Sequence, residues 1–367
     1  MTEIDIQNDV IKTYMAYGPY DSFCSTVSYL YYSDVKELAD KVNWIADKPV
    51  GYTVNWTHST LSSIEVLENG KEWIKEYDIS EPSYTIMNLT PGSIYTYTVY
   101  DENGVVITSG EFKAVGQLRM VYIKDTWNCR DLGGWIGLNN KQVKYGKIFR
   151  GASLSGKYLG GDLTDHINYD FHSQSYIDQL GIKAELDLRG DKDQPGKWGN
   201  DKTPHSSSFK VTKLIGVDYI RIMSDFGLIN PQTDSSLVKC VSWIINELKL
   251  GKPVIFHCRC GFHRTGAVAY LIEGLLGVKP GDIARDYEIN SFSSFNSIKR
   301  YASYPTYVFF KDEFGYVNGN NFQERCYYYL NQYFKDVHVN ADDLDWFICE
   351  MLGLDSYEHP KDALNYD

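Results

Sequence analysis

The stretch from Pro253 to Leu276 constrains the fold of this chain more than any other part of it. It starts with the continuous apolar run Val254-Ile255-Phe256, which is typical of a central strand in a parallel sheet. A short glycine-containing loop follows, and the apolar run from Arg264 to Leu276 predicts a buried helix. A strand that passes through a short loop into a helix is typical of α/β folds, in which ligands bind at the carboxyl ends of the strands. We therefore expect an α/β domain whose ligand-binding site lies at Cys258, just after the strand.

The elements before this stretch alternate in the same way. Ala184–Arg189 has the pattern of a buried strand, and Ser235–Leu250 has that of a helix. Because strand and helix alternate, we expect residues 117–367 to form an α/β domain with a central, mainly parallel sheet flanked by helices.

The front of the chain has a different pattern. Apolar residues recur at helical spacing from Ser22 to Ile45, which predicts one or two helices in a helical segment of residues 1–48. In residues 49–116 the period switches to two, with turn dipeptides between the runs, which predicts an all-β sandwich of antiparallel strands. The alternating runs include Tyr52–Trp56, Ile64–Val66 and Ile94–Tyr100. A chain of 367 residues is long for a single hydrophobic core, so we expect a multidomain protein.

The charge of the chain restricts its partners. With 36 Lys and Arg residues against 48 Asp and Glu residues, the formal net charge is −12. Binding of nucleic acid or anionic lipid is therefore not expected as the main activity. The most apolar long stretch, Gly266 to Val278, is too short to span a bilayer and contains Glu273, so we expect no integral membrane segment.

The sequence does not determine the cellular compartment of the protein. Residues 1–20 lack a basic start followed by an apolar run, so the chain as written carries no signal peptide. It is either an exported protein, in the periplasm or at the cell surface, whose leader has been removed, or a cytoplasmic one. The seven cysteines are irregularly spaced and odd in number, which does not suggest a disulfide framework.

The loop after Phe256 carries groups suited to phosphate ester cleavage. Cys258 supplies a nucleophile, and Arg264 supplies a planar fork that can bind two phosphate oxygens. Backbone N–H groups of the loop and of the following helix start would point into one bowl, and such surroundings keep a thiol deprotonated. The residues expected to bind the phosphate are Arg259, Cys260, Gly261, Phe262, His263 and Arg264.

No cofactor or metal is expected at this loop. His257, Cys258, Cys260 and His263 are all acceptable zinc ligands by residue type. Their spacing is nevertheless poor for a tetrahedral site, because His257 and Cys258 are adjacent.

The segment His-Cys-x2-Gly-x2-Arg-Thr-Gly, which runs from His257 to Gly266, resembles the signature of the protein tyrosine and dual-specificity phosphatase superfamily. The resemblance implies that Cys258 forms a phosphocysteine intermediate and that Arg264 binds the phosphate. It also implies that the Thr265 hydroxyl assists departure of the thiolate and that His257 supports the loop. No metal is implied.

A second motif, Asn128-Cys129-Arg130-Asp131-Leu132-Gly133-Gly134, is similar to the Asn-x-Arg-Asp-Leu-Gly-Gly element of a bacterial tyrosine-phosphatase family. Phe149–Ala152 and Leu186–Arg189 follow in the family's order, so the resemblance extends from about Gln117 to Leu352. It implies that Asn128, Arg130 and Asp131 help to shape the active site.

The chain departs from that bacterial family at Phe262-His263, where its members commonly carry Lys-Asp. Without the lysine, a highly phosphorylated lipid or inositol substrate is less expected. Without the aspartate, the loop loses one candidate proton shuttle, for which His263 could substitute because imidazole titrates near neutral pH.

The run Leu89–Val99 resembles the tyrosine-bearing strand of fibronectin type III-like domains, over about Pro49 to Val115. The region contains no recognisable catalytic constellation, so we expect a structural or docking module. Its partner, if it has one, would be a protein or a glycan.

The reaction also needs a general acid, because a poor leaving oxygen must be protonated as the P–O bond breaks. Asp225 follows a strand-like run from Tyr219 to Met223 and is the first candidate. Asp191 and Asp193, which follow the Ala184–Arg189 strand, are the alternatives.

Together these features predict a phosphomonoester hydrolase of the protein tyrosine or dual-specificity type, acting on a phosphorylated protein. Phosphoinositides and inositol polyphosphates, the latter as in a phytase-like enzyme, are alternative substrates of the same loop. A different class remains open as well, a binding or adhesion module that docks phosphorylated ligands without turning them over.

Overall fold

The computed structural model describes residues 1–16, 48–57, 61–124, 126–154, 172–189, 214–222, 230–258, 261–292 and 313–366. The helices expected from Ser22 to Ile45 lie outside these residues. Among the described residues, no helix is both long enough and apolar enough to cross a membrane.

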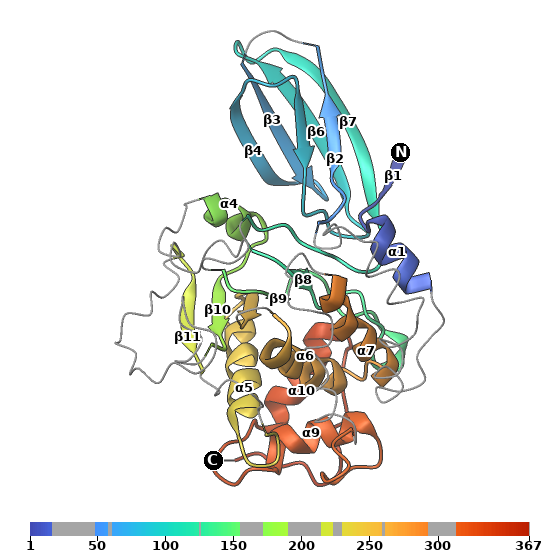
Figure 1. The fold of residues 1–367 in the computed structure, drawn as a ribbon, viewed down its shortest axis with the longest axis vertical. Helices are drawn as coiled ribbons and strands as arrows, with labels where there is room; N and C mark the ends of the chain where they lie inside the picture. Colours follow the sequence, from blue (N-terminus) through green and yellow to red (C-terminus); the bar gives the residue numbers. More distant parts are fainter. Residues whose placement is uncertain are drawn as a thin grey trace.

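The strands of the front region form two sheets at one end of the molecule (Figure 1). The larger has the order β1 (Thr2–Asp5), β7 (Val106–Val115), β6 (Ile94–Asp101), β3 (Ser62–Glu68), β4 (Lys71–Ile79). The smaller pairs β2 (Tyr52–Asn55) with β5 (Ser83–Ile86). One apolar core, which includes Val54 of β2, Val66 of β3 and Phe112 of β7, joins both sheets. The N-terminal strands therefore exist, and their assignment to a fibronectin type III-like sandwich stays a prediction.

The expected helical character of residues 1–48 is wrong at its start. Thr2–Asp5 is a strand that pairs in parallel with Phe112–Val115 of β7. Only after it does a helix follow, α1 (Asp9–Ala16). The strand is short and its residues are mixed in character, so its pairing depends on a partner about a hundred residues away rather than on a local pattern.

The second half of the chain has the expected α/β architecture. Its sheet has the order β11 (Asp218–Arg221), β10 (Ala184–Asp187), β12 (Val254–His257), β9 (Ile148–Gly151), β8 (Arg130–Asp131). The first four strands are parallel and β8 is antiparallel to β9, so the sheet is mainly parallel.

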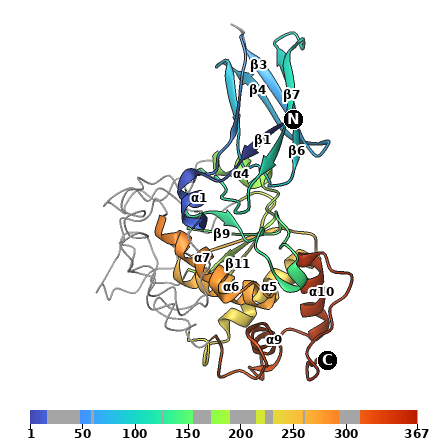
Figure 2. The ribbon, with the colours of Figure 1, turned by 90° about the vertical axis from the view of Figure 1, so that its right-hand side faces the viewer.

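Side-chain alternation along the sheet separates two cores. Ile148, Val254 and Phe256 belong to the larger core, whereas Phe149 and Ile255 belong to the smaller one on the other side. The smaller core also takes residues of α4 (His172–Gln179). The larger core takes residues from the other helices, which Figure 2 shows gathered together. These are α5 (Ser236–Lys249), α6 (His263–Leu275), α7 (Pro280–Ile289), α9 (Phe322–Gln332) and α10 (Ala341–Leu352).

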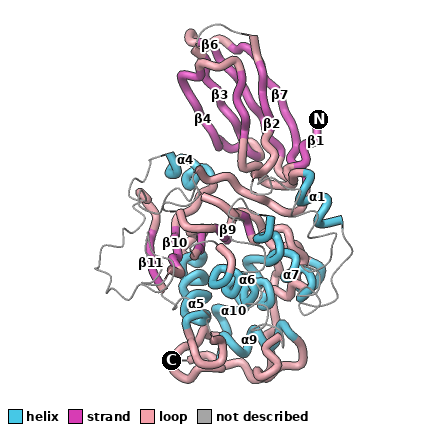
Figure 3. The backbone as a smooth tube through the Cα atoms, viewed as in Figure 1, coloured by secondary structure: helices cyan, strands magenta, loops and turns pink. Residues whose placement is uncertain are grey.

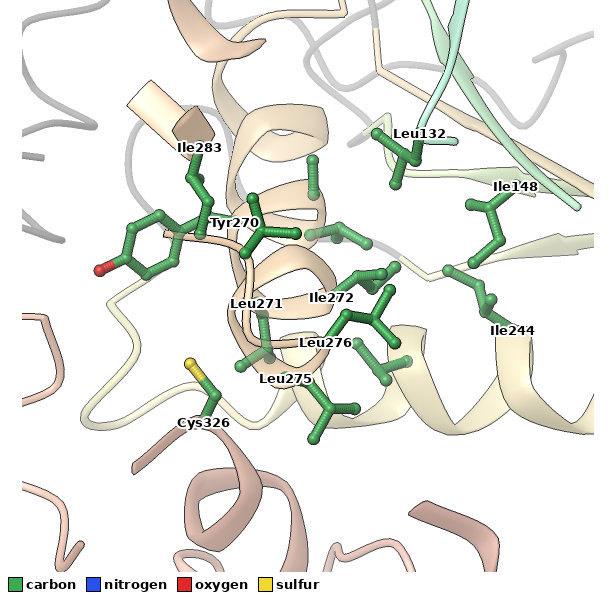
Figure 4. Close-up of a cluster of buried hydrophobic side chains, with 14 of the residues drawn as sticks. Leu132, Ile148, Ile244, Tyr270, Leu271, Ile272, Leu275, Leu276, Ile283 and Cys326 are labelled. Carbon is green, nitrogen blue, oxygen red and sulfur yellow. The ribbon is translucent and has the colours of Figure 1, made fainter. Parts of the chain in front are cut away.

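Helix α6 lies at the centre of the larger core (Figures 3 and 4). All of its residues from Arg264 to Leu275 are buried, which explains its apolar sequence. At Gly266 a Cβ atom would lie 2.4 Å from the Tyr287 ring, so glycine is what allows α7 to pack this closely on α6. The helix that follows Cys258 is thus fixed on every side.

The two halves of the chain are in direct contact. Arg119 donates hydrogen bonds to the carbonyls of Asn88 (2.8 Å) and Leu89 (3.2 Å), and Trp73 Nε1 donates to the carbonyl of Gln179 (3.0 Å). From the N-terminal segment, Tyr14 packs into the larger core and donates to Glu288 Oε2 at 2.6 Å. The α/β region therefore includes side chains that precede residue 117.

Candidate active site

Cys258 and Arg264 lie at the two ends of the loop that joins β12 to α6. Cys258 follows the last residue of the central strand β12 and is 3% exposed. Arg264 lies in the first turn of α6, is buried, and donates from Nη1 to the Leu188 carbonyl at 2.9 Å. The next residue, Thr265, has a buried hydroxyl with no hydrogen-bond partner among the described residues.

Some of the expected phosphate-binding residues can be placed and others cannot. Gly261 and Phe262 are buried and His263 is partly buried at the start of α6. Arg259 and Cys260 lie outside the described residues, and so do the three candidate acids, Asp191, Asp193 and Asp225.

Gly261 is held in place by two side chains from other strands and loops. Its φ is +71°, and a Cβ atom there would lie 2.6 Å from the Gly151 carbonyl oxygen, so only glycine fits. Its own carbonyl accepts hydrogen bonds from Arg150 Nη2 (3.0 Å) and Asn128 Nδ2 (3.3 Å). The backbone of the loop is thereby tied to β9 and to the segment before β8.

These two side chains belong to a buried ionic cluster built on Asp286 of α7. Arg130 Nε lies 2.7 Å from Asp286 Oδ1, and Arg150 Nη1 contacts Oδ2 of the same carboxylate. Burial raises the pKa of Asp286, but the two guanidinium groups and their hydrogen bonds outweigh this and hold the pKa below its usual value. Burial and then the charge of Arg130 lower the pKa of Arg150 to about 10.

Two asparagines connect this cluster to the loop. Asn128 adopts the left-handed conformation, with φ +56°, which asparagine tolerates better than most residues. Its Nδ2 donates to Asn290 Oδ1 at 2.8 Å, and its Oδ1 accepts from Arg130 Nη1 at 2.8 Å. Asn128 therefore holds the loop through the Gly261 carbonyl, and Arg130 in turn holds Asn128.

Asp131 lies on a different side of the same motif. Its carboxylate accepts from Arg119 Nη1 (3.1 Å) and from the backbone N–H groups of Gly133 (2.8 Å) and Gly146 (2.6 Å). Because Arg119 in turn binds the front region, Asp131 braces the contact between the two halves of the chain. Among the described residues, the hydrogen bonds of Asp131 do not include the loop from Cys258 to Arg264.

A third group of polar side chains lines the carboxyl ends of β10 and β11. The Arg189 guanidinium binds the Asp187 carboxylate at 2.6–3.0 Å, and Tyr219 donates to the same carboxylate at 3.0 Å. Burial raises the pKa of Asp187, but Arg189 outweighs this effect and holds the pKa well below its usual range. Arg189 also donates to Ser153 Oγ at 2.8 Å, so this edge of the sheet is tightly connected.

His257 lies between this group and the nucleophile. It is fully buried, and its Nδ1 atom lies 3.2 Å from the Cys258 carbonyl oxygen. Its Nε2 atom lies 2.9 Å from Glu185 Oε1 of β10.

Several of these residues have no role that the sequence alone predicts. Glu185 and Asp187 stand inside the strand expected over Ala184–Arg189, and Asp286 and Asn290 lie far along the chain. Acidic side chains are almost never fully buried unless they are paired. Two acids in a strand expected to be buried therefore indicate that Glu185 and Asp187 have partners. For Asp286 and Asn290, nothing in the local pattern distinguishes them from surface residues.

The second half of the chain is similar to known phosphatases. The family model described as the tyrosine phosphatase family matches residues 121–361. A Cupriavidus necator protein named as a tyrosine-protein phosphatase is 23% identical over 180 residues. That match covers 44% of this chain, and the chain spans 59% of the length of that curated relative.

Solved structures are similar over comparable parts of the chain. The core catalytic domain of the PP-IP phosphatase SIW14 from S. cerevisiae is 19% identical, with 42% of this chain and 76% of that chain covered and a TM-score of 0.26. TpbA of P. aeruginosa is 14% identical, with 44% and 81% covered and a TM-score of 0.27.

The family match runs from just before Asn128 to beyond α10, so it includes the Asn128 motif, the loop from Cys258 to Arg264 and the whole α/β sheet. With well over half of its 367 residues inside that match, the chain belongs to the tyrosine phosphatase family.

Proposed function

We propose that this chain hydrolyses phosphate monoesters through a phosphocysteine intermediate on Cys258. The observation that carries the proposal is that a buried thiol at the end of β12 and a buried guanidinium in the first turn of α6 stand at the two ends of one loop. A phosphate between them would face the N-terminal end of α6, where backbone N–H groups and the helix dipole favour an anion.

Each step has a candidate group. Arg264 and the loop N–H groups bind the phosphate oxygens, and the Cys258 thiolate attacks phosphorus as the ester oxygen leaves. Asp225 protonates that oxygen, and water then cleaves the phosphocysteine. The Thr265 hydroxyl, which has no other described partner, would donate to the thiolate as it departs.

A phosphotyrosine protein is the substrate class that we propose. Phe262 is apolar and buried, and it stands where members of the bacterial family commonly carry a lysine that could bind additional phosphates. The net charge of −12 also disfavours highly charged polyphosphates. The strands before residue 117 have a structural or docking role in this account, with a fibronectin type III-like fold.

A phosphate-release panel tests the proposal and its substrate class. Wild-type protein is assayed with a phosphotyrosine peptide, a phosphoinositide and an inositol polyphosphate. Turnover of the phosphotyrosine peptide with the highest kcat/KM supports the proposal, and preference for either polyphosphate class contradicts the substrate assignment. Binding of all three without phosphate release would identify a docking module instead.

Asp225→Asn is expected to reduce turnover of an alkyl phosphate on the order of 10²-fold or more, because its leaving oxygen is basic and needs a proton. An activated aryl phosphate should be slowed less. The chain leaves β11, after Arg221, at the same sheet edge as Cys258, because β11, β10 and β12 are parallel and in register. This supports an acid shortly after β11.

Asp191→Asn and Asp193→Asn are the matched controls for this variant, since β10 ends at the same edge. They should leave both rates close to those of wild type. If either control loses alkyl phosphate turnover while Asp225→Asn retains it, the acid follows β10 and the assignment of Asp225 is wrong.

A further inference from the structure

A carboxylate and an imidazole form a pair inside the α/β sheet, directly behind the nucleophile. Glu185 is the second residue of β10, and His257 is the last residue of the adjacent strand β12. Neither side chain is exposed to solvent, and Glu185 Oε1 lies 2.9 Å from His257 Nε2. Acidic side chains are rarely fully buried unless they are paired, so the contact with His257 indicates the role of Glu185.

The hydrogen bonds of the ring define where its protons are. A backbone carbonyl can only accept, so the 3.2 Å contact between His257 Nδ1 and the Cys258 carbonyl requires a proton on Nδ1. The other ring nitrogen faces a carboxylate, which also accepts. The second contact therefore needs a proton between Nε2 and Glu185, and the imidazole is cationic when that proton resides on Nε2.

Most of the neighbouring charges favour the cationic form of His257. Asp187 Oδ1 lies 4.0 Å from His257 Nδ1 and favours the cation, whereas the Arg189 guanidinium opposes it. Burial on its own lowers the pKa of His257, but Asp187 and Glu185 outweigh burial and raise the pKa above its usual value. These are the charged groups that face the ring from β10 and the loop after it.

We propose that Glu185 is a positioning residue that holds His257 as an imidazolium behind Cys258 and so stabilises the thiolate. The inference rests on the proposed function, since it assigns Cys258 the role of nucleophile. Glu185 acts through His257 in two ways. It fixes the ring so that Nδ1 holds the Cys258 carbonyl, and it supplies the negative charge that keeps a cation next to the thiolate.

The test uses Glu185→Gln in the full-length chain, because glutamine keeps the shape and one acceptor oxygen but removes the charge. The rate of Cys258 alkylation by iodoacetamide is followed against pH, with peptide mapping to Cys258. The midpoint of this profile should move up by about one pH unit in the variant, the shift expected from losing one charge-assisted partner. Loss of packing alone would not move it.

Asp218→Asn is the matched control. Asp218 is on β11, the strand on the other side of β10, and its side chain is 56% exposed. Its profile should coincide with that of wild type. A Glu185→Gln profile that also coincides with wild type would overturn the proposal.

Two features keep this test separate from that of the proposed function. Alkylation needs no turnover, so a protein that releases no phosphate still reports on Glu185. If Glu185→Gln does not fold, long-range ¹H–¹⁵N spectra of the wild-type imidazoles provide the second measurement. A His257 ring protonated on both nitrogens at pH 7.5 supports the proposal, and a neutral ring protonated only on Nδ1 overturns it.

Discussion

Cys258→Ser protein is expected to release no measurable phosphate from any phosphomonoester while still binding phosphate or vanadate. Serine keeps the size of the residue, but its hydroxyl is not ionised near neutral pH and cannot replace the thiolate as nucleophile. Loss of a nucleophile costs far more than loss of a binding contact, so turnover should fall by at least about 10³-fold. Steady-state phosphate release and vanadate titration measure the two effects separately.

Cys240→Ser is the matched control for this variant, since Cys240 is also buried but lies on α5 within the larger core. It should cost some stability and retain kcat/KM. Residual turnover above a few per cent in Cys258→Ser, or loss of turnover in Cys240→Ser alone, would mean that Cys258 is not the nucleophile.

Asp286→Ala is expected to lower the free energy of unfolding by about 3–5 kcal/mol, because it leaves Arg130 and Arg150 as buried charges without their carboxylate. Activity should fall as well. Arg150 and Asn128 bind the Gly261 carbonyl, and both belong to the network that Asp286 anchors. The phosphate loop would therefore lose its support in protein that remains folded. Urea unfolding gives the first effect, and kcat/KM below the transition gives the second.

The control is Asp282→Ala in the first turn of the same helix, at a partly exposed position. It removes one negative charge from a helix start, which is worth about 1 kcal/mol or less. If Asp286→Ala is no more destabilising than Asp282→Ala, the cluster does not hold the loop. A wild-type value of kcat/KM in Asp286→Ala would likewise show that the cluster does not hold the loop.

Glu273 is a further titratable group beside this cluster. Neither of its carboxylate oxygens has a hydrogen-bond partner among the described residues. Burial, and then the charge of Asp286, raise the pKa of Glu273 well above its usual value. This shift favours the neutral form of Glu273, and Asp286 is the carboxylate that pairs with Arg130 and Arg150.

The parts of the fold that were predictable are those with strong local patterns. The expected strand Pro253–His257 is confirmed as β12, and the expected helix Arg264–Leu276 is confirmed as α6. Both are buried, so their sequences are mostly apolar and their boundaries are marked by loop residues. The strand β10 is buried as well, although two of its four residues are acidic.

The parts that were missed depend on tertiary contacts. Strand β1 forms because it pairs with β7, which lies far along the chain. The contacts of α1 are equally distant in sequence, as the hydrogen bond from Tyr14 to Glu288 shows. Asp286 is separated from Arg130 by more than 150 residues, so no window of sequence joins them. Arg130 and Asp131 belong to one motif, yet they reach different places because they are successive residues of β8, and successive strand residues point to opposite faces.

We propose that catalysis passes through a covalent phosphocysteine on Cys258. The most direct measurement is peptide mass spectrometry of protein quenched rapidly in acid during turnover of an activated aryl phosphate, with Cys258→Ser protein in parallel. We expect one phosphoryl group on the peptide that contains Cys258, which accumulates in wild-type protein and is absent from the variant. Turnover without any phosphorylated Cys258 peptide, or a phosphoryl group on another residue, would contradict it.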